Sequence, residues 1–152
     1  MTIFSLVSFD PKFSINLPQF FKKKFDKSNV RILFIDDNFR DFPVIQNLKE
    51  IGWSVDAIDD CCNVDDDKIQ NSHIIFVDFS GVARVLSESE QGISLIKLIK
   101  RKYGNKKRVI LYSGQDRFSL GDNIDIADNK LSKNSDTERF IEMIEDEIKK
   151  LK

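Results

Sequence analysis

Short apolar runs in the chain end in polar side chains that could act on a phosphoryl group. They are Asp36 and Asp37 after the first run, Asp78 after the third and Ser113 after the fourth, and Lys133 follows the segment placed as a fifth strand between a polar loop and the last helix. Carboxylates close together repel one another unless a cation or a proton intervenes. Oxygen ligands without a nearby histidine or cysteine suit Mg²⁺, which keeps open positions for phosphoryl oxygens. A hydroxyl and a fixed positive charge suit stabilisation of the same oxygens.

The elements that must position these side chains have the pattern of a parallel sheet with crossover helices. From residue 30 onward, short runs rich in Val, Ile and Phe alternate with longer segments of helical period. The carboxyl ends of parallel strands lie at one edge of the sheet, so we expect the polar residues there to converge. The predicted strands are 30–35, 53–58, 73–77, 108–112 and 130–132, and the second, which alternates most, is placed nearer an edge.

Helices are expected between these strands. Pro43 falls in the first turn of one helix, where proline is tolerated, and Gly52 lies where that helix would end. A short helix is expected near 64–70. A longer amphipathic helix is expected over 92–102, with Gly104 as its stop.

The last helix is the best marked in the sequence. Ser135 and Glu138 form a predicted capping box ahead of it. Its spacing places five apolar residues on one face: Phe140, Ile141, Ile144, Ile148 and Leu151. We interpret the aromatic residues at strand and helix core positions as packing residues rather than ligand contacts; they are Phe34, Phe76, Tyr112 and Phe140.

Residues 1–29 do not follow the strand and helix alternation and are predicted to form an N-terminal extension to a single domain over 30–152. They hold two of the three prolines, several phenylalanines and a basic run, and Pro18 could start a short amphipathic helix. We favour packing of these phenylalanines on the domain or a partner over a role at a membrane surface.

Composition excludes several other classes of protein. The 152 residues carry a formal net charge of -1, which provides no overall field for nucleic acid. No apolar run is long enough to span a bilayer and no secretory signal is evident, so a cytoplasmic location is predicted. Cys61 and Cys62 are adjacent, which disfavours a disulfide between them, and we interpret them as free thiols.

Four motifs, in this order, resemble the receiver domains of response regulators, the CheY-like group, over about 30–152. The first strand and its acidic pair are ILFIDDN at 32–38, and the third strand is IIFVD at 74–78. The fourth strand reads VILYSG at 109–114, and ADNKLSK at 127–133 ends in the lysine. The resemblance implies a doubly wound, flavodoxin-like α/β fold with a five-stranded parallel sheet of order 2-1-3-4-5.

The resemblance also implies roles for the polar residues. Asp78 would accept a phosphoryl group from a sensor histidine kinase or a histidine phosphotransfer protein. Asp36, Asp37, Asp78 and the backbone carbonyl of Ser80 would hold Mg²⁺. Lys133 would pair with the phosphoryl group.

Further residues would read out and limit phosphorylation. Ser113 would move to bind the phosphoryl group and so switch the binding of a downstream protein partner. Ser80 and Gln115 fall where the family tunes autodephosphorylation, so the chain is expected to be a phosphoacceptor rather than a metabolic enzyme. Direct binding to nucleic acid or to a membrane is not expected. The chain is expected to be a monomer or a weak homodimer.

Two departures from the family pattern leave alternatives open. Asn134 follows Lys133 where the family has proline, and Lys130 replaces the usual aromatic switch residue. Lys130 is therefore an alternative pocket amine. A pseudo-receiver that binds partners without phosphorylation is the alternative function.

Two other classes of protein are disfavoured. A phosphatase is disfavoured because Ser80 stands where such enzymes carry a second acid. A dinucleotide-binding domain is disfavoured because Asp36 and Asp37 occupy the turn that would have to be rich in glycine.

Overall fold

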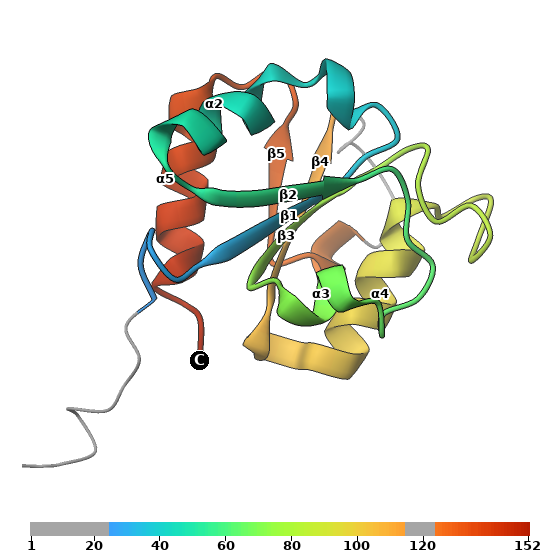
Figure 1. The fold of residues 1–152 in the computed structure, drawn as a ribbon. Coiled ribbons are helices and arrows are strands. Elements are labelled where there is room, and N and C mark those ends of the chain that lie inside the picture. The colour runs from blue at the N-terminus through green and yellow to red at the C-terminus, as the bar shows by residue number, and fades with distance from the viewer. Residues whose placement is uncertain (1–24, 115–123) are drawn as a thin grey trace, which may run out of the picture.

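Five strands form one parallel sheet in the computed structural model, which describes residues 25–114 and 124–152 (Figure 1). The strand order is β2-β1-β3-β4-β5, which confirms the predicted order. The strands are β1 Arg31–Ile35, β2 Ser54–Ile58, β3 Ile74–Asp78, β4 Arg108–Ser113 and β5 Asn129–Ser132. All the predicted strands are therefore confirmed, and the second does lie at an edge.

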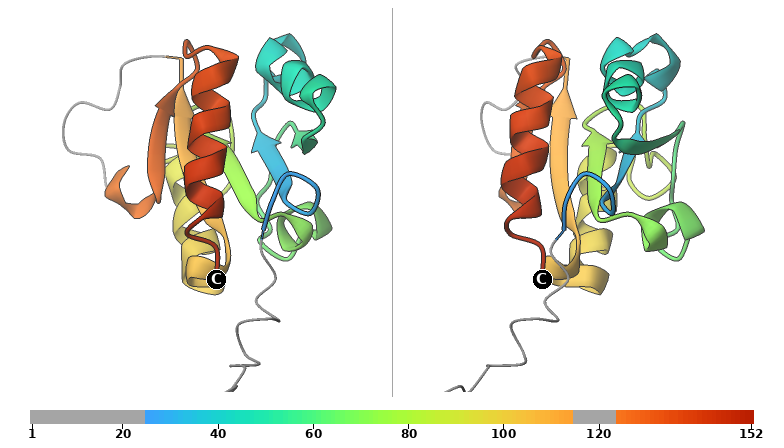
Figure 2. Two further views of the ribbon diagram at one scale, coloured as in Figure 1. Left: turned by 90° about the vertical axis from the view of Figure 1, so that its left-hand side faces the viewer. Right: turned by 60° about the vertical axis from the view of Figure 1, so that its left-hand side comes forward.

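Helices cover both faces of this sheet (Figures 1 and 2). Helices α2 (Pro43–Ile51) and α5 (Thr137–Ile148) pack on one face, and α3 (Asp67–Asn71) and α4 (Gly92–Tyr103) pack on the other. Short 3-10 helices complete the described elements: η1 Phe39–Asp41, η2 Gly104–Lys106 and η3 Ile124–Ile126.

The alternation of side chains along each strand produces two separate cores. In β1, Ile32 and Phe34 point into the core under α2 and α5, whereas Leu33 and Ile35 point into the core under α3 and α4. Strands buried on both faces must be apolar throughout, which is why their sequence signal is strong.

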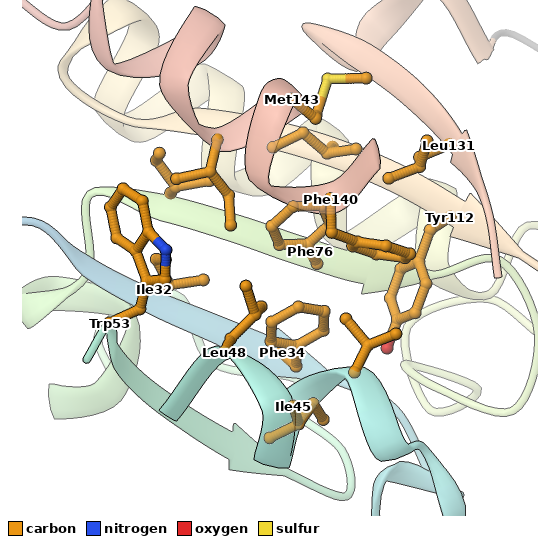
Figure 3. Packing of buried hydrophobic residues seen from close by; sticks show 14 of the residues in the cluster. Ile32, Phe34, Ile45, Leu48, Trp53, Phe76, Tyr112, Leu131, Phe140 and Met143 are labelled. Atoms are coloured by element: carbon orange, nitrogen blue, oxygen red, sulfur yellow. The ribbon is translucent and has the colours of Figure 1, made fainter. Parts of the chain in front are cut away.

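Aromatic rings fill the core between the sheet, α2 and α5, as predicted (Figure 3). The rings of Phe34 and Phe76 stack with centroids 4.5 Å apart, and Phe140 lies 5.6 Å from Phe76. Tyr112 meets Phe34 edge to face at 5.7 Å. These are favourable aromatic geometries, so the rings stabilise this core beyond the area they bury.

The helix ends confirm one prediction and correct another. Pro43 is the first residue of α2 and Gly52 ends that helix in a left-handed conformation, as predicted. The capping box at Ser135 is wrong, because Asp136 Oδ1 accepts the hydrogen bond from the Arg139 amide at 2.9 Å. The Ser135 amide instead donates to the Ser132 carbonyl at 3.1 Å, so Ser135 belongs to the turn after β5.

The described part of the predicted extension, 25–29, lies against the domain. Phe25 packs on the core under α2 and α5, and its ring lies 5.1 Å from that of His73. The predicted helix from Pro18 lies outside the described residues, as does Gln115. Among the described helices, none is long and apolar enough to cross a membrane.

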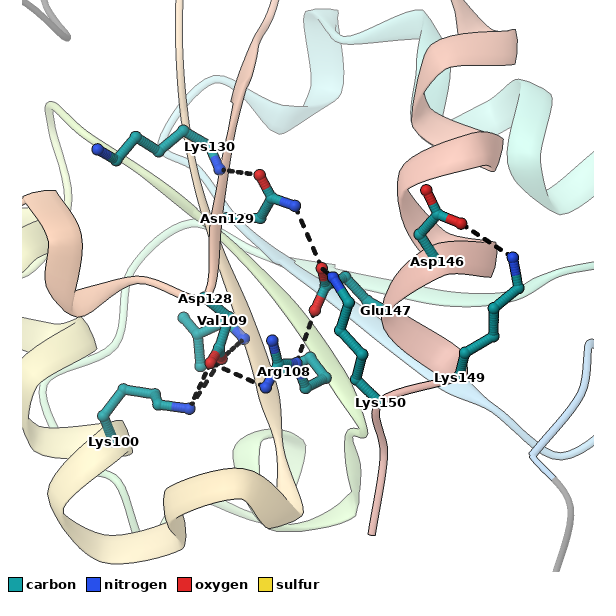
Figure 4. Close-up of polar contacts among 10 residues, drawn as sticks. All are labelled: Lys100, Arg108, Val109, Asp128, Asn129, Lys130, Asp146, Glu147, Lys149 and Lys150. Carbon is teal, nitrogen blue, oxygen red and sulfur yellow. Dashed lines mark hydrogen bonds and ion pairs between the residues drawn. The ribbon is translucent and has the colours of Figure 1, made fainter.

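Charged side chains form a network at the end of the sheet where the strands begin (Figure 4). Asp128 pairs with Lys100 at 2.8 Å and with Arg108 at 3.0 Å. Glu147, fully buried on α5, pairs with Arg108 at 2.6 Å and with Lys150 at 2.7 Å. The network joins α4, β4, the start of β5 and α5, and each of the two acids has two cationic partners.

Lys107, by contrast, is buried beside backbone carbonyls. Its Nζ donates to the carbonyl oxygens of Gln70 at 2.8 Å and Ser72 at 2.6 Å. Burial, aided by the charge of Arg31, lowers the pKa of the Lys107 amine to about 8. Since the pKa of an unfolded lysine is about 10.4, the unfolded chain binds more protons between these values, and this group makes stability rise with pH there.

We therefore expect Lys107→Met to remove part of the pH dependence of stability. Between about pH 7.5 and about pH 9.5 the free energy of unfolding of the wild type should rise by about 2 kcal/mol relative to this variant. Urea unfolding followed by fluorescence of Trp53, the only tryptophan, measures the difference. Lys106→Met, at the exposed neighbouring lysine, should keep the wild-type slope; equal slopes for all three proteins would contradict the prediction.

Candidate phosphoacceptor and metal site

Carboxylates from two neighbouring strands meet at the carboxyl edge of the sheet. Strands β1 and β3 pair with Ile35 opposite Val77, so Asp36 and Asp78 are the next residues on each. One oxygen from each of Asp36, Asp37 and Asp78 lies within 4.8 Å of the others. Asp36 is 0% exposed and Asp78 5%, whereas Asp37 is exposed. The structure thus brings together the three carboxylates that the sequence singled out.

The ammonium group of Lys133 lies between the two buried carboxylates. Its Nζ is 2.6 Å from Asp78 Oδ2 and 2.9 Å from Asp36 Oδ2. Lys130, the alternative pocket lysine, instead pairs with the exposed Asp125 at 2.9 Å (Figure 4 shows its side chain directed away from α5). The pocket lysine in this structure is therefore Lys133.

Hydrogen bonds hold the turn that carries Lys133 and Asn134. Asn134 stands at the position where the receiver-domain pattern has proline. The Lys133 amide donates to the Ser113 carbonyl at 2.9 Å. The Asn134 side-chain amide donates to the Gly114 carbonyl at 3.4 Å, and the Asn134 backbone amide donates to Ser132 Oγ at 3.2 Å. Asn134 thus ties the turn to β4 through contacts that a proline could not make.

The two predicted serines both lie at this edge of the sheet. Ser113 is the last residue of β4 and is 4% exposed. Ser80 is exposed, and its amide lies 3.4 Å from Asp78 Oδ1. Their roles, as switch hydroxyl and as carbonyl ligand, stay predictions.

Tyr112 is a site residue that the sequence interpretation missed. Its ring is fully buried in the aromatic core, as predicted, but its hydroxyl lies at the edge of that core and donates to Asp36 Oδ2 at 2.7 Å. The Lys133 ammonium lies 4.9 Å from the centre of the same ring. A tyrosine rather than a phenylalanine at the end of a buried strand was the available signal, because a buried hydroxyl needs a partner.

Two glycines let the segment after β3 approach Asp37 and the backbone of Asp78 closely. Gly81 has φ +88°, and a Cβ there would collide with the Asp37 carboxylate. A Cβ on Gly92, the first residue of α4, would collide with the carbonyl oxygen of Asp78. The Gly81 amide donates to Gln91 Oε1 at 2.7 Å, which closes the loop between the two glycines.

The two buried carboxylates have pKa values shifted in opposite directions. Burial raises the pKa of Asp78 to about 6, and its contact with Lys133 offsets only part of that effect. Burial also acts to raise the pKa of Asp36, but hydrogen bonds from Lys133, the Asn38 amide and Tyr112 outweigh it and lower the pKa. Burial opposes the charge of Lys133, yet the two carboxylates raise its pKa, so the amine stays protonated.

The charges at the site favour a bound cation. Within the described part of the chain, Lys133 is the only cation paired with any of the three carboxylates. An excess of negative charge therefore remains at neutral pH, and the donors are oxygens in a cluster small enough to share one ion. Hard oxygen donors of this kind fit Mg²⁺, which binds through one or two carboxylates and keeps other positions open.

Removing the pocket cation should destabilise the fold. We expect Lys133→Met to lower the free energy of unfolding by about 3 kcal/mol at neutral pH, because two buried carboxylates lose their cation. A carboxyl without its cation has a raised pKa in the folded state, so protonation should shrink the deficit as the pH falls towards about 5. Urea unfolding at both pH values tests this. Lys130→Met should cost less than about 1 kcal/mol, as for a surface pair; equal losses for the two variants would refute the assignment of the pocket lysine.

Gly92 lies so close to the backbone of Asp78 that no side chain should fit at this position. We expect Gly92→Ala to lower the free energy of unfolding by about 2 kcal/mol or more, because the new Cβ must displace the backbone of Asp78. Gly114→Ala is the matched control, since a Cβ there meets only Lys133 Cδ at 3.9 Å, an ordinary contact. Thermal unfolding of the two variants gives the comparison, and equal melting temperatures would show that the backbone is not so close.

Comparison with known proteins supports the same architecture. No family model and no curated protein matches the sequence. Among solved structures, the CheY-like receiver domain protein from Methanospirillum hungatei is 18% identical with a TM-score of 0.60, covering 80% of this chain and 95% of its own. The NtrX receiver domain from Brucella abortus is 20% identical (TM-score 0.58, covering 78% and 98%). TrrA from Thermotoga maritima in complex with Mg²⁺-BeF is 17% identical (TM-score 0.62, covering 78% and 98%). The resemblance inferred from the motifs is thus confirmed for the fold: the chain has the same fold as these CheY-like receiver domains.

Proposed function

We propose that this chain is a response-regulator receiver that accepts a phosphoryl group on Asp78. The observation that carries the proposal is the position of Asp78, buried at the strand edge with Lys133 2.6 Å from one carboxylate oxygen and two further carboxylates beside it. A nucleophile, a fixed cation and a cation-binding cluster are the parts that phosphoryl transfer to a carboxylate needs.

In the proposed reaction, an oxygen of the ionised Asp78 attacks the phosphorus of a phosphohistidine on a kinase or phosphotransfer protein. The phosphorus–nitrogen bond breaks, and its electron pair leaves with the histidine, which takes up a proton if it is released as the cation. The product is an acyl phosphate on Asp78. Lys133 then pairs with a phosphoryl oxygen instead of the Asp78 carboxylate.

Asp36, Asp37, Asp78 and the carbonyl of Ser80 are the proposed ligands of Mg²⁺. When bound, Mg²⁺ would neutralise part of the negative charge on the phosphoryl oxygens and on the carboxylates. The donor chemistry of the cluster supports this assignment. TrrA, which has the same fold, is known in complex with Mg²⁺-BeF.

The proposed output is a change in protein binding. Ser113 would turn toward the phosphoryl group, and because β5 pairs with β4 at Ser113, a shift there reaches the neighbouring strand. The proposed partners are a sensor histidine kinase or histidine phosphotransfer protein and a downstream protein, in the cytoplasm, with the chain as a monomer or a weak homodimer. A shuttle between phosphohistidines is the same chemistry with a second histidine as the acceptor.

A pseudo-receiver is the second candidate, and it has a specific observation in its favour. Lys130, at the position of the family's aromatic switch, is tied to Asp125 at 2.9 Å. A protein of this kind would keep the acidic cluster but bind its partner without phosphorylation.

The first experiment is intact-mass analysis after incubation with Mg²⁺ and acetyl phosphate. We expect the wild type to gain the mass of one phosphoryl group, and Asp78→Ala or an added chelator to abolish the gain. Lys130→Met should still be labelled, because Lys130 contacts none of the three carboxylates in the structure.

The absence of an adduct on the wild type, together with no binding of beryllofluoride, would reject the phosphoacceptor and favour the pseudo-receiver. Labelling that survives in Asp78→Ala would place the phosphoryl group on another residue.

A further inference from the structure

The hydroxyl of Tyr112 shares an oxygen of Asp36 with Lys133. Asp36 Oδ2 accepts from Tyr112 at 2.7 Å and lies 2.9 Å from Lys133 Nζ, while Oδ1 accepts from the Asn38 amide at 2.9 Å. Asp36 is 0% exposed, so these protein donors take the place of water around its carboxylate. A cation that uses Asp36 must therefore share oxygens that already accept hydrogen bonds.

The two donors to Oδ2 differ in their freedom to move. The ring of Tyr112 is fully buried and lies 5.7 Å from Phe34, 5.8 Å from Phe42 and 6.0 Å from Phe76, so packing fixes the direction of its hydroxyl. The ammonium group of Lys133 lies at the end of a long, flexible side chain and also contacts Asp78. Of the two donors to Asp36 Oδ2, Tyr112 is thus the one that stays in place when Lys133 turns to another partner.

A fixed donor on a buried carboxylate weakens the attraction of that carboxylate for a metal ion. The hydrogen bond stabilises the site without metal, and the cation must compete with it for the same negative charge. Without the hydroxyl, the Asp36 carboxylate would lack one hydrogen bond in the site without metal. The binding of a cation would then be more favourable in free energy.

We propose that Tyr112 is a positioning residue that fixes the orientation of Asp36 and lowers the affinity of the site for Mg²⁺. This inference rests on the proposed function for the presence of Mg²⁺. It predicts effects of opposite sign on fold stability and on metal affinity, which loss of packing alone does not produce.

The test compares Tyr112→Phe with Tyr103→Phe, which removes the other tyrosine hydroxyl of the chain. Tyr103 donates to the Val64 carbonyl at 2.7 Å, away from the carboxylates, and so is a matched control. Isothermal titration with Mg²⁺ gives the dissociation constant, and thermal unfolding without metal gives the melting temperature. We expect Tyr112→Phe to bind Mg²⁺ about tenfold more tightly and to melt about 3 to 8 °C lower. Tyr103→Phe should also melt lower but bind Mg²⁺ as the wild type does.

A second measurement does not depend on the folding of Tyr112→Phe. In Tyr103→Phe protein, Tyr112 is the only tyrosine, so the NMR signal of its ζ-carbon reports the hydroxyl alone. We expect this signal to shift with Mg²⁺ along the same saturation curve as the calorimetric titration, because the ion draws charge from the shared oxygen.

The outcomes separate this inference from the proposed function. Two results would overturn the role of Tyr112 alone. The first is that the wild type binds Mg²⁺ and Tyr112→Phe binds it with the same or a larger dissociation constant. The second is that the ζ-carbon signal does not shift when Mg²⁺ is added. No Mg²⁺ binding by the wild type and by Tyr103→Phe would overturn the proposed metal site and the inference with it.

Discussion

The contact of one ammonium group with two buried carboxylates organises the carboxyl edge of the sheet. Lys133 reaches Asp36, directly after β1, and Asp78, the last residue of β3, so it joins the turn after β5 to strands on the far side of β4. One cation compensates two buried acids only in part, because moving charges out of water costs more than a single pair recovers. The edge therefore holds an excess of negative charge that a metal ion or a proton can relieve.

At the opposite end of the sheet the acids are paired differently. There Asp128 and Glu147 each contact two cations, and Arg108 bridges them (Figure 4). Both ends join the sheet to surrounding helices and loops through charged side chains. Among the described residues, the three carboxylates at the carboxyl edge share a single cation, Lys133, whereas each acid at the opposite end has two.

The aromatic core and the charged edge are physically continuous through Tyr112. Its ring packs against Phe34 and Phe76 between the sheet and α5, while its hydroxyl belongs to the hydrogen bonds of Asp36. A change in the charge of the site therefore acts on a side chain held by the core, next to Ser113 on the same strand. The loop after β3 is joined to the edge differently, through Gly81, which lies against the Asp37 carboxylate, and Gly92, which lies against the backbone carbonyl of Asp78.

Much of the fold and several site residues could be predicted from the sequence. Strands buried on both faces are continuous apolar runs, so their places and the polar residues that end or follow them, such as Asp36, Asp78 and Ser113, were visible without a structure. The parallel arrangement then implies that these ends converge, because strands that point the same way end at the same edge.

Other features depended on contacts between residues far apart in the chain. A sequence does not show whether Lys130 or Lys133 reaches the carboxylates, because one residue of shift along β5 reverses the face on which a side chain lies. Nor does it show that Asp136 caps α5, since the turn after β5 decides which polar residue meets the free amides. Tyr112 has the composition of a core residue, and only the packing of β1 beside β3 and β4 brings its hydroxyl to Asp36. Local periodicity determined the elements of this protein, and the partners of its polar atoms were decided by three-dimensional packing, because a hydrogen bond or ion pair depends on distances that neighbouring residues do not set.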